Sequence, residues 1–271
     1  MPSYLITGAN RGIGFEFVRQ LSSDSSNTVI GIVRDKAAAE ATVAKELEGR
    51  KNIHILETDV TDYNGLKRAA EATAKITGGG LDYVISNAAL IPFWSAFEPL
   101  GELGKEPERL EKELAECFNV NVIATVHLIN LFIPLVLKGE AKKVITITTG
   151  FADAELNAKY NLSIAGPYSI SKAAVNMVVA KYSAEYAEQG VLFLALAPGM
   201  VDTGNMDKLT PEQGQKAMGM MGKFKDYAPD FSGPITPEES VKLMRAVWDK
   251  ASVANGDGGA FLSQFGNKQW L

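Results

Sequence analysis

Short apolar runs rich in β-branched residues alternate with longer stretches of helical periodicity along most of this chain. Such runs are typical of strands buried on both faces of a parallel sheet, and the helical stretches between them are long enough for crossover connections. The pattern predicts an α/β fold: a single domain over residues 1–271 with a Rossmann-type, doubly wound parallel sheet of about seven strands and helices on both faces. The predicted strands are residues 4–7, 28–33, 53–57, 83–86, 143–148, 191–197 and 259–263, with helices at 12–21, 64–76 and 237–250.

Charge and cysteine content exclude several classes of protein. The 271 residues carry 27 basic and 32 acidic side chains, so no general attraction to nucleic acid or anionic membrane is expected. Cys117 is the single cysteine, which rules out an intrachain disulfide and favours a reducing, cytoplasmic location. The apolar stretch 120–137 is interrupted by Asn121, His127, Asn130 and Pro134, which predicts a buried helix rather than a membrane span.

A glycine-rich turn follows the first predicted strand in the sequence YLITGANRGIG. A strand that ends in such a turn directs backbone N–H groups and the positive end of the next helix toward a phosphate. The turn therefore predicts a dinucleotide site. Its glycine spacing differs from G-x-G-x-x-G, and no lysine follows as in a Walker loop, so a kinase or ATPase is not expected. A tight turn that binds nothing is the alternative. The residues assigned to this site are Gly8, Asn10, Arg11, Gly12, Ile13 and Gly14.

The residues after the second predicted strand indicate which nucleotide binds. A carboxylate at this place would bind a ribose 2′-hydroxyl, but the sequence VRDK places Arg34 there. A guanidinium suits a 2′-phosphate, and Arg11 could add a second positive charge. We therefore expect NADP(H) rather than NAD(H). A register shift would instead present Asp35 to the ribose, and a solvated Arg34–Asp35 surface pair is also possible.

Tyr168 and Lys172 lie one helical turn apart in YSISKAAVNM. An ammonium beside a phenol favours the phenolate and is expected to lower the pKa of the tyrosine, as suits an acid that protonates a carbonyl during hydride reduction. The spacing alone proves little, because Tyr63 and Lys67 share it in a region without any other catalytic signal.

Several motifs occur together in the order TGANRGIG, NAA, NVN, YSISK and PGMVDT. In this respect the chain resembles the classical short-chain dehydrogenase/reductase family over nearly its whole length. Within that family, YLITGANRGIG, YSISKAAVNM and GGAFLSQFG resemble the branch of C-factor-like and fungal norsolorinic acid ketoreductase-like proteins.

The resemblance implies a role for each matching residue. Tyr168 would donate a proton to the substrate oxygen, Lys172 would hold the nicotinamide ribose, and Asn121 would position a water that links Lys172 to solvent. The remaining matches would contact the cofactor. They are Asp59 and Val60 beside the adenine, Asn87 and Ala88 below the cofactor, and Pro198, Gly199, Val201 and Thr203 facing the nicotinamide amide.

Two positions depart from the family pattern. Thr149 stands where the family usually has a serine; its hydroxyl can still donate a hydrogen bond, although its methyl group stiffens χ1. Thr148 is the competing assignment, disfavoured because strand alternation would turn it away. Ala89 stands where the family mostly has glycine.

Residues 198–237 are rich in glycine, proline and methionine, which predicts a mobile substrate lid at about 200–235. Packing of these side chains on the core is an equal alternative.

Phe93, Trp94 and Phe97 could likewise line a substrate cleft or the core. His54 and His127 lack partners at metal-ligand spacing, so both are interpreted as structural and no metal is expected.

Two functions follow from these features. The first is an NADPH-dependent reductase of a ketone or aldehyde on a bulky apolar or aromatic small molecule. The second, kept open by Thr149, is an NADP(H)-binding regulatory protein with little or no turnover. The stretch 120–137 and the helix from Tyr168 onward are apolar on more than one side, which predicts a homodimer or homotetramer, with core packing as the alternative.

Overall fold

A seven-stranded parallel sheet forms the centre of the computed structural model, which describes residues 1–204 and 209–271. Its strand order is β3-β2-β1-β4-β5-β6-β7, so the chain reverses direction across the sheet between β1 and β4. The predicted fold class is confirmed. The strands are β1 (Ser3–Thr7), β2 (Thr28–Val33), β3 (Ile53–Glu57), β4 (Tyr83–Ser86), β5 (Lys143–Ile147), β6 (Leu192–Ala197) and β7 (Phe261–Ser263).

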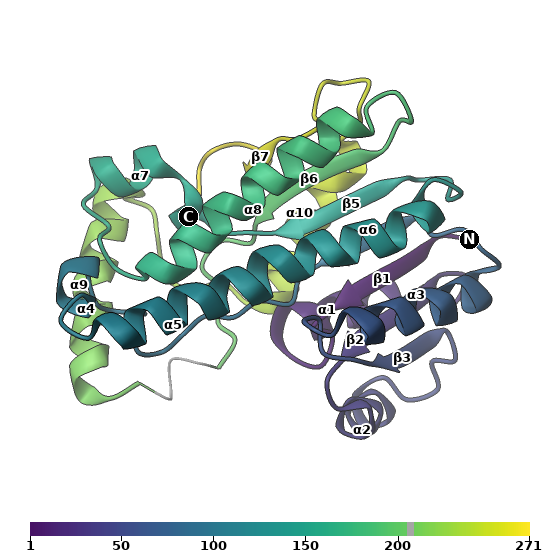
Figure 1. Ribbon diagram of the computed structural model, residues 1–271, viewed down its shortest axis with the longest axis horizontal. Coiled ribbons are helices and arrows are strands. Elements are labelled where there is room, and N and C mark those ends of the chain that lie inside the picture. The colour runs from purple at the N-terminus through teal and green to yellow at the C-terminus, as the bar shows by residue number, and fades with distance from the viewer. Residues whose placement is uncertain (205–208) are drawn as a thin grey trace.

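Helices cover both faces of the sheet (Figure 1). The helices are α1 (Gly12–Leu21), α2 (Lys36–Glu46), α3 (Tyr63–Thr77), α4 (Leu100–Leu103), α5 (Pro107–Phe118), α6 (Ala124–Val136), α7 (Ala154–Lys159), α8 (Gly166–Glu185), α9 (Pro211–Tyr227) and α10 (Pro237–Lys250), with a π-helical turn η1 (Asn119–Ile123) and a 3-10 turn η2 (Gly150–Ala152).

Alternate residues of the strands enter two separate cores. Ile6 and Ile145 pack with α1 and α10 on one face, whereas Leu5 and Val144 pack with α3, α6 and α8 on the other. Successive side chains of a strand point to opposite faces, so continuous apolar runs are what a sheet covered on both sides requires.

The helical run Pro107–Val136 is long and apolar enough to cross a membrane, the one such run in the described part of the chain. Half of its most apolar window is nevertheless buried in the molecule, and Phe132 and Val136 are fully buried in the core beneath α6. Core packing therefore explains its composition.

The predicted lid segment contains a helix where loop composition suggested a long loop. Pro211 occupies the first turn of α9, where a missing N–H costs nothing, and Thr210 and Gln213 form a reciprocal capping box. Figure 1 shows α9 at one end of the molecule together with α4 and α7. Met206, one of the methionines that suggested a lid, lies outside the described residues.

Candidate functional site

The glycine turn after β1 is joined to the segment after β4, at the point where the strand order reverses. Thr7 Oγ1 accepts hydrogen bonds from the backbone N–H groups of Asn87 and Ala88, both at 3.0 Å, and Asn87 Nδ2 donates to Thr7 O at 3.0 Å. In open α/β sheets, ligands bind in the crevice at this reversal. The structure thus places two predicted cofactor segments side by side.

Steric conditions in this turn require glycine. Gly8 (φ 68°) and Gly12 (φ 55°) adopt left-handed backbone conformations. At Gly14 a Cβ atom would lie 2.1 Å from Gly8 O and 2.6 Å from Asn87 Nδ2. The turn is therefore a close-packed cradle of bare backbone at the start of α1, which fits a dinucleotide pyrophosphate.

Arg34 and Asp35 follow β2, and Asp59 follows β3 shortly after. These charged residues therefore lie at the same end of two neighbouring parallel strands. Arg34 is exposed, while Asp35 Oδ1 accepts from Ala38 N at 2.9 Å and caps α2. Although burial opposes its ionisation, hydrogen bonds from Thr61 and the charge of Arg34 hold the pKa of Asp59 below its ordinary value. The cap directs Asp35 toward its own helix, whereas the Arg34 side chain is left exposed.

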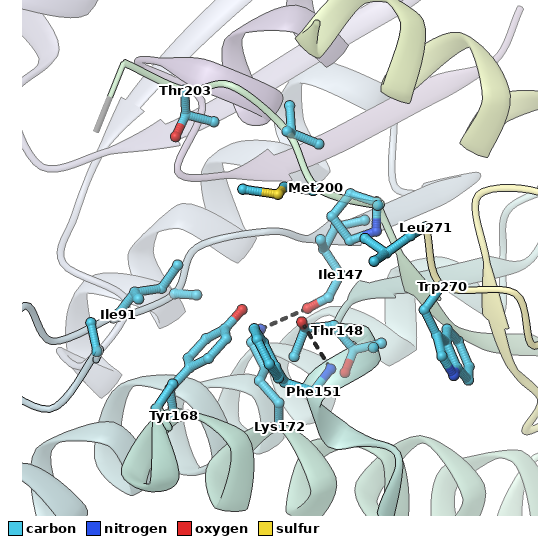
Figure 2. Close-up of a pocket in the computed structure, with 18 of the residues that line it drawn as sticks. Ile91, Ile147, Thr148, Phe151, Tyr168, Lys172, Met200, Thr203, Trp270 and Leu271 are labelled. Atoms are coloured by element: carbon cyan, nitrogen blue, oxygen red, sulfur yellow. Dashed lines mark hydrogen bonds between the residues drawn. The ribbon is translucent and has the colours of Figure 1, made fainter. Parts of the chain in front are cut away.

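Tyr168 and Lys172 lie on α8 and reach the end of β5. Lys172 is 3% exposed, and its Nζ donates to Ile147 O at 2.7 Å. The same Nζ lies 6.0 Å from the centroid of the Tyr168 ring, and the side chain of Thr149 lies near the Tyr168 hydroxyl. Figure 2 shows Tyr168 and Lys172 projecting into one cavity. The structure brings together three of the four predicted catalytic side chains.

The electrostatics of this group differ from the prediction. We expected Lys172 to lower the pKa of Tyr168, but burial is the dominant influence and raises it above its ordinary value. Burial also lowers the pKa of Lys172, to about 8. Removal from water penalises the charged form of each group. The Tyr168 phenol is thus kept protonated at neutral pH, as a proton donor must be.

Asn121, the fourth predicted catalytic residue, lies in η1 with its side chain fully engaged by protein groups. Its Oδ1 accepts from Leu90 N at 2.8 Å, and its Nδ2 donates to Leu90 O at 3.1 Å and to Ser171 Oγ at 2.8 Å. This side chain fixes the segment after β4 against the residue that precedes Lys172. The predicted link through water stays a prediction.

The two competing threonines after β5 have different surroundings. Thr149 Oγ1 accepts from Phe151 N at 3.3 Å, and its side chain lies near the Tyr168 hydroxyl. Thr148 also lines the cavity, contrary to the expectation from strand alternation, because β5 ends at Ile147. Its buried Oγ1 has no hydrogen-bond partner among the described residues. The contact with Tyr168 favours Thr149.

The turn after β6 closes the site opposite the glycines. Pro198 O accepts from Ser240 Oγ at 2.7 Å, Gly199 is left-handed at φ 80°, and Val201 pairs with Ile235. Thr203 faces the glycine turn, because a Cβ at Gly12 would lie 3.3 Å from its Cγ2.

A cavity of about 340 Å³ joins these groups to an apolar chamber, and its size suits a small organic ligand. Its lining includes Ile13, Asn87 and residues of the 198–203 turn. Most of the remaining lining is apolar, and Lys172 carries the single charged side chain among the described lining residues. The apolar lining comprises Phe97, Phe151, Leu156, Met200, Met220, Phe224, Tyr227, Trp270 and Leu271, among others.

Some lining residues were predicted and others were missed. Met200, Met220, Phe224 and Tyr227 come from the predicted lid, whereas Phe93 is exposed and Trp94 stacks under Arg109 at 4.3 Å. Trp270 was not predicted; its ring packs on Phe261 with centroids 4.2 Å apart, and its backbone N–H donates to Tyr227 Oη at 2.9 Å. Only the tertiary contact with α9 identifies it.

The family model for short chain dehydrogenase matches residues 3–214. The chain therefore belongs to the short-chain dehydrogenase/reductase family, oxidoreductases that use nicotinamide cofactors.

Particular relatives refine this placement. The chain is 55% identical to short chain dehydrogenase virK of Hypocrea virens and 50% identical to short-chain dehydrogenase/reductase iacC of Pestalotiopsis fici, over 100% of each chain. These relatives confirm the fungal branch. Among solved structures, the NADPH-bound carbonyl reductase from chicken fatty liver is 28% identical, with a TM-score of 0.75 over 98% of both chains.

Proposed function

We propose that this protein is an NADPH-dependent carbonyl reductase that acts on a ketone or aldehyde of a bulky apolar or aromatic molecule. The observation that carries the proposal is the position of the protonated Tyr168 phenol, which lines one cavity together with Ile13 of the glycine turn and many apolar side chains. A regulator without turnover has no need of a proton donor in a substrate-sized cavity.

A bound reduced nicotinamide supplies the hydride, and the protein supplies the proton. Tyr168 donates its hydroxyl proton to the carbonyl oxygen as negative charge develops there. Thr149 lies near the Tyr168 hydroxyl in the same cavity, and its own hydroxyl can donate a hydrogen bond to the carbonyl oxygen. Lys172, fixed by Ile147 O, places a positive charge near the developing phenolate and stabilises it.

The charge distribution at the nucleotide end supports NADP(H). Arg34 is exposed beside Asp59, and Arg11 lies exposed in the glycine turn. Two guanidinium groups suit a 2′-phosphate, while Asp35 is directed to the α2 N-terminus. A related solved structure is described as NADPH-bound carbonyl reductase, which agrees with this assignment.

The chamber favours an uncharged substrate. Lys172 is the single ionic side chain of its described lining, so a cationic substrate would be desolvated without a counter-charge. Phe151, Phe224 and Trp270 provide aromatic surfaces, and Met200 and Met220 provide adaptable ones.

Substitution of Tyr168 by Phe tests the assigned proton donor. Turnover of aromatic ketones, followed by loss of NADPH absorbance, should fall by about 10²–10⁴-fold, the usual contribution of a general acid, while NADPH affinity changes little. Tyr63→Phe is the matched control, because Tyr63 has the same lysine spacing but packs edge-on against His127 outside the cavity. Full turnover in Tyr168→Phe would contradict the assignment.

The unmodified protein tests the alternative function. If it binds NADPH but consumes none with any ketone, aldehyde or quinone, the regulatory protein is favoured over the reductase.

Substitution of Arg34 by Ala tests the nucleotide preference. NADPH affinity should fall by about tenfold or more, as for loss of a charge-assisted phosphate contact, with little change for NADH. Arg109→Ala, an exposed arginine stacked on Trp94, is the control. Equal losses for both nucleotides would refute a 2′-phosphate contact.

We also propose a homodimer or homotetramer in the cytoplasm. Phe118, Ile123, Ile170 and Met177 are large exposed apolar side chains on the adjoining elements α5, η1 and α8, and Ile170 and Met177 lie on one face of α8. Met177→Glu should shift the sedimentation coefficient toward that of the monomer. An unchanged sedimentation coefficient would place the interface elsewhere. Imaging of a fluorescent fusion tests the cytoplasmic location.

A further inference from the structure

Helix α9 contributes to the wall of the cavity that contains Tyr168, yet few of its side chains are buried. Met220, Phe224 and Tyr227 line that cavity, whereas Ala217 and Phe224 are the buried residues of the helix. Its three glycines leave open space where side chains could pack, and glycine weakens a helix relative to alanine. Polar contacts with other segments are therefore expected to contribute to holding α9 in place.

Two such contacts join α9 to the segment between β4 and α4. This segment also lines the cavity, for example with Ile91. Lys216 Nζ forms an ion pair with Glu98 Oε1, and Gln213 Nε2 donates to Phe93 O at 3.3 Å. The partners are 118 and 120 residues apart in the sequence. Both contacts thus connect two separate parts of the cavity wall.

The ion pair is partly sheltered from water. The side chains of Lys216 and Glu98 are 35% and 30% exposed. Hydrogen bonds with Glu98 and Glu212 hold the pKa of Lys216 above its ordinary value, so its ammonium group is charged at neutral pH. In the described part of the chain, Arg19–Glu46 is the one other ion pair that joins distant elements, and it lies outside the cavity lining. Partly exposed pairs contribute modestly, so this pair can hold α9 and still break reversibly.

We propose that Glu98 and Lys216 are positioning residues of the reductase: their ion pair holds α9 against the segment after β4 while substrate is bound, and its breakage lets substrate enter and product leave. This inference rests on the proposed function and adds a control of access to it. Neither residue lines the cavity, so the pair acts through the placement of the α9 side chains that do, such as Met220 and Phe224.

Hydrogen exchange of the α9 amide groups tests the ion pair without any turnover. Glu98→Gln removes the charge from the segment after β4 and changes no residue of α9. Exchange over residues 217–224 should become about three- to tenfold faster, between the values expected for an exposed ion pair and for a buried charged hydrogen bond. Glu102→Gln is the matched control, because Glu102 pairs with the exposed Lys105 and not with α9, and it should leave this exchange as it is.

A double-mutant cycle tests whether the two residues act through each other. Lys216→Met also loses the contact with Glu212 at 3.1 Å, so its effect on exchange should exceed that of Glu98→Gln. Adding Glu98→Gln to Lys216→Met should then accelerate exchange no further. Additive effects would show that the two residues act independently, and they would overturn the proposal.

Steady-state kinetics test the effect on access, with NADPH saturating and para-acetylbiphenyl as an uncharged, bulky ketone. In the unmodified enzyme, KM for the ketone should rise with NaCl concentration, because salt screens the ion pair. Glu98→Gln should raise KM about threefold or more at low salt, remove this salt dependence and leave kcat undiminished. A lower kcat at unchanged KM would mean that Glu98 supports the catalytic groups and not access, and would overturn the proposal.

The two readouts separate this inference from the proposed function. If no ketone is reduced but exchange in α9 depends on the Glu98–Lys216 pair, the reductase proposal fails and the control of α9 stands. If ketones are reduced and Glu98→Gln changes neither exchange nor KM, the role of the ion pair is refuted and the reductase stands.

Discussion

Gly14→Ala is the sharpest test of the predicted cofactor cradle. The added methyl carbon would lie 2.1 Å from Gly8 O and 2.6 Å from Asn87 Nδ2, whereas ordinary contacts begin near 3.4 Å. The turn after β1 would therefore have to move away from α1 by about 1 Å, and Asn87 with it. Both groups are held by short hydrogen bonds, including Gly8 N to Ile32 O at 2.9 Å.

The expected magnitude follows from two opposing effects. Alanine gains about 1 kcal/mol over glycine in a helix. Overpacking at a rigid site costs about 1–3 kcal/mol or more, and here the obstructing atoms are backbone and a bonded amide. We expect net destabilisation of about 1–2 kcal/mol. We also expect an increase of at least about tenfold in the Kd for NADPH, because the displaced backbone is the surface that would receive the pyrophosphate.

Urea unfolding and calorimetric titration with NADPH measure the two effects. Gly101→Ala in α4 is the control, because a Cβ there meets nothing within 4 Å, and it should leave both quantities near their original values. If Gly14→Ala binds NADPH as tightly as the unmodified protein, the glycine turn is not the pyrophosphate site and the steric argument is wrong.

Three further predictions concern the catalytic group. Because burial lowers the pKa of Lys172 to about 8, its positive charge is present below that pH and lost above it, so kcat/KM for reduction should fall as pH rises through about 8. In the measured pH profile, Lys172→Arg should move this fall in kcat/KM to higher pH. A fall at the same pH as in the unmodified protein would mean that another group titrates there. Thr149→Val should lower kcat by about 10²-fold, because it removes a hydrogen-bond donor near the reacting oxygen. Thr149→Ser keeps that donor and should lower kcat much less. Equal rates for the two variants would exclude a role of the Thr149 hydroxyl in the reaction. Asn121→Ala removes two bonds to Leu90 and one to Ser171 and should cost about 3 kcal/mol in urea unfolding; a cost below about 1 kcal/mol would show that these bonds do not hold the segment.

The sequence by itself determined the sheet and the glycine turn that we propose as the nucleotide site. Strand and helix periodicities are local properties, so β2, β3, β4, α1 and α10 begin and end where the pattern predicts. The cradle was predictable for the same reason, since its glycines lie within seven residues of one another at the end of a single strand.

The helix in the predicted lid shows where composition misleads. Gly214, Gly219 and Gly222 suggested a loop, but α9 is stabilised by its capping box and by apolar packing of Ala217 and Phe224. Such packing depends on partners distant in sequence, such as Phe151, so composition alone does not reveal it.

The motifs around Tyr168 and Lys172 singled out this pair in the sequence, and the tertiary structure shows how its surroundings differ from those of Tyr63 and Lys67. Tyr63 and Lys67 have the spacing of Tyr168 and Lys172, yet Tyr63 lies half exposed at the start of α3, while Tyr168 meets Thr149 at the end of β5. The structure also reversed the expected direction of the Tyr168 pKa, because desolvation depends on everything packed around a group and not on its neighbour along the helix. For the same reason the apolar chamber that we propose for the substrate, with Trp270 as a wall, exists only once segments far apart in the chain have packed together.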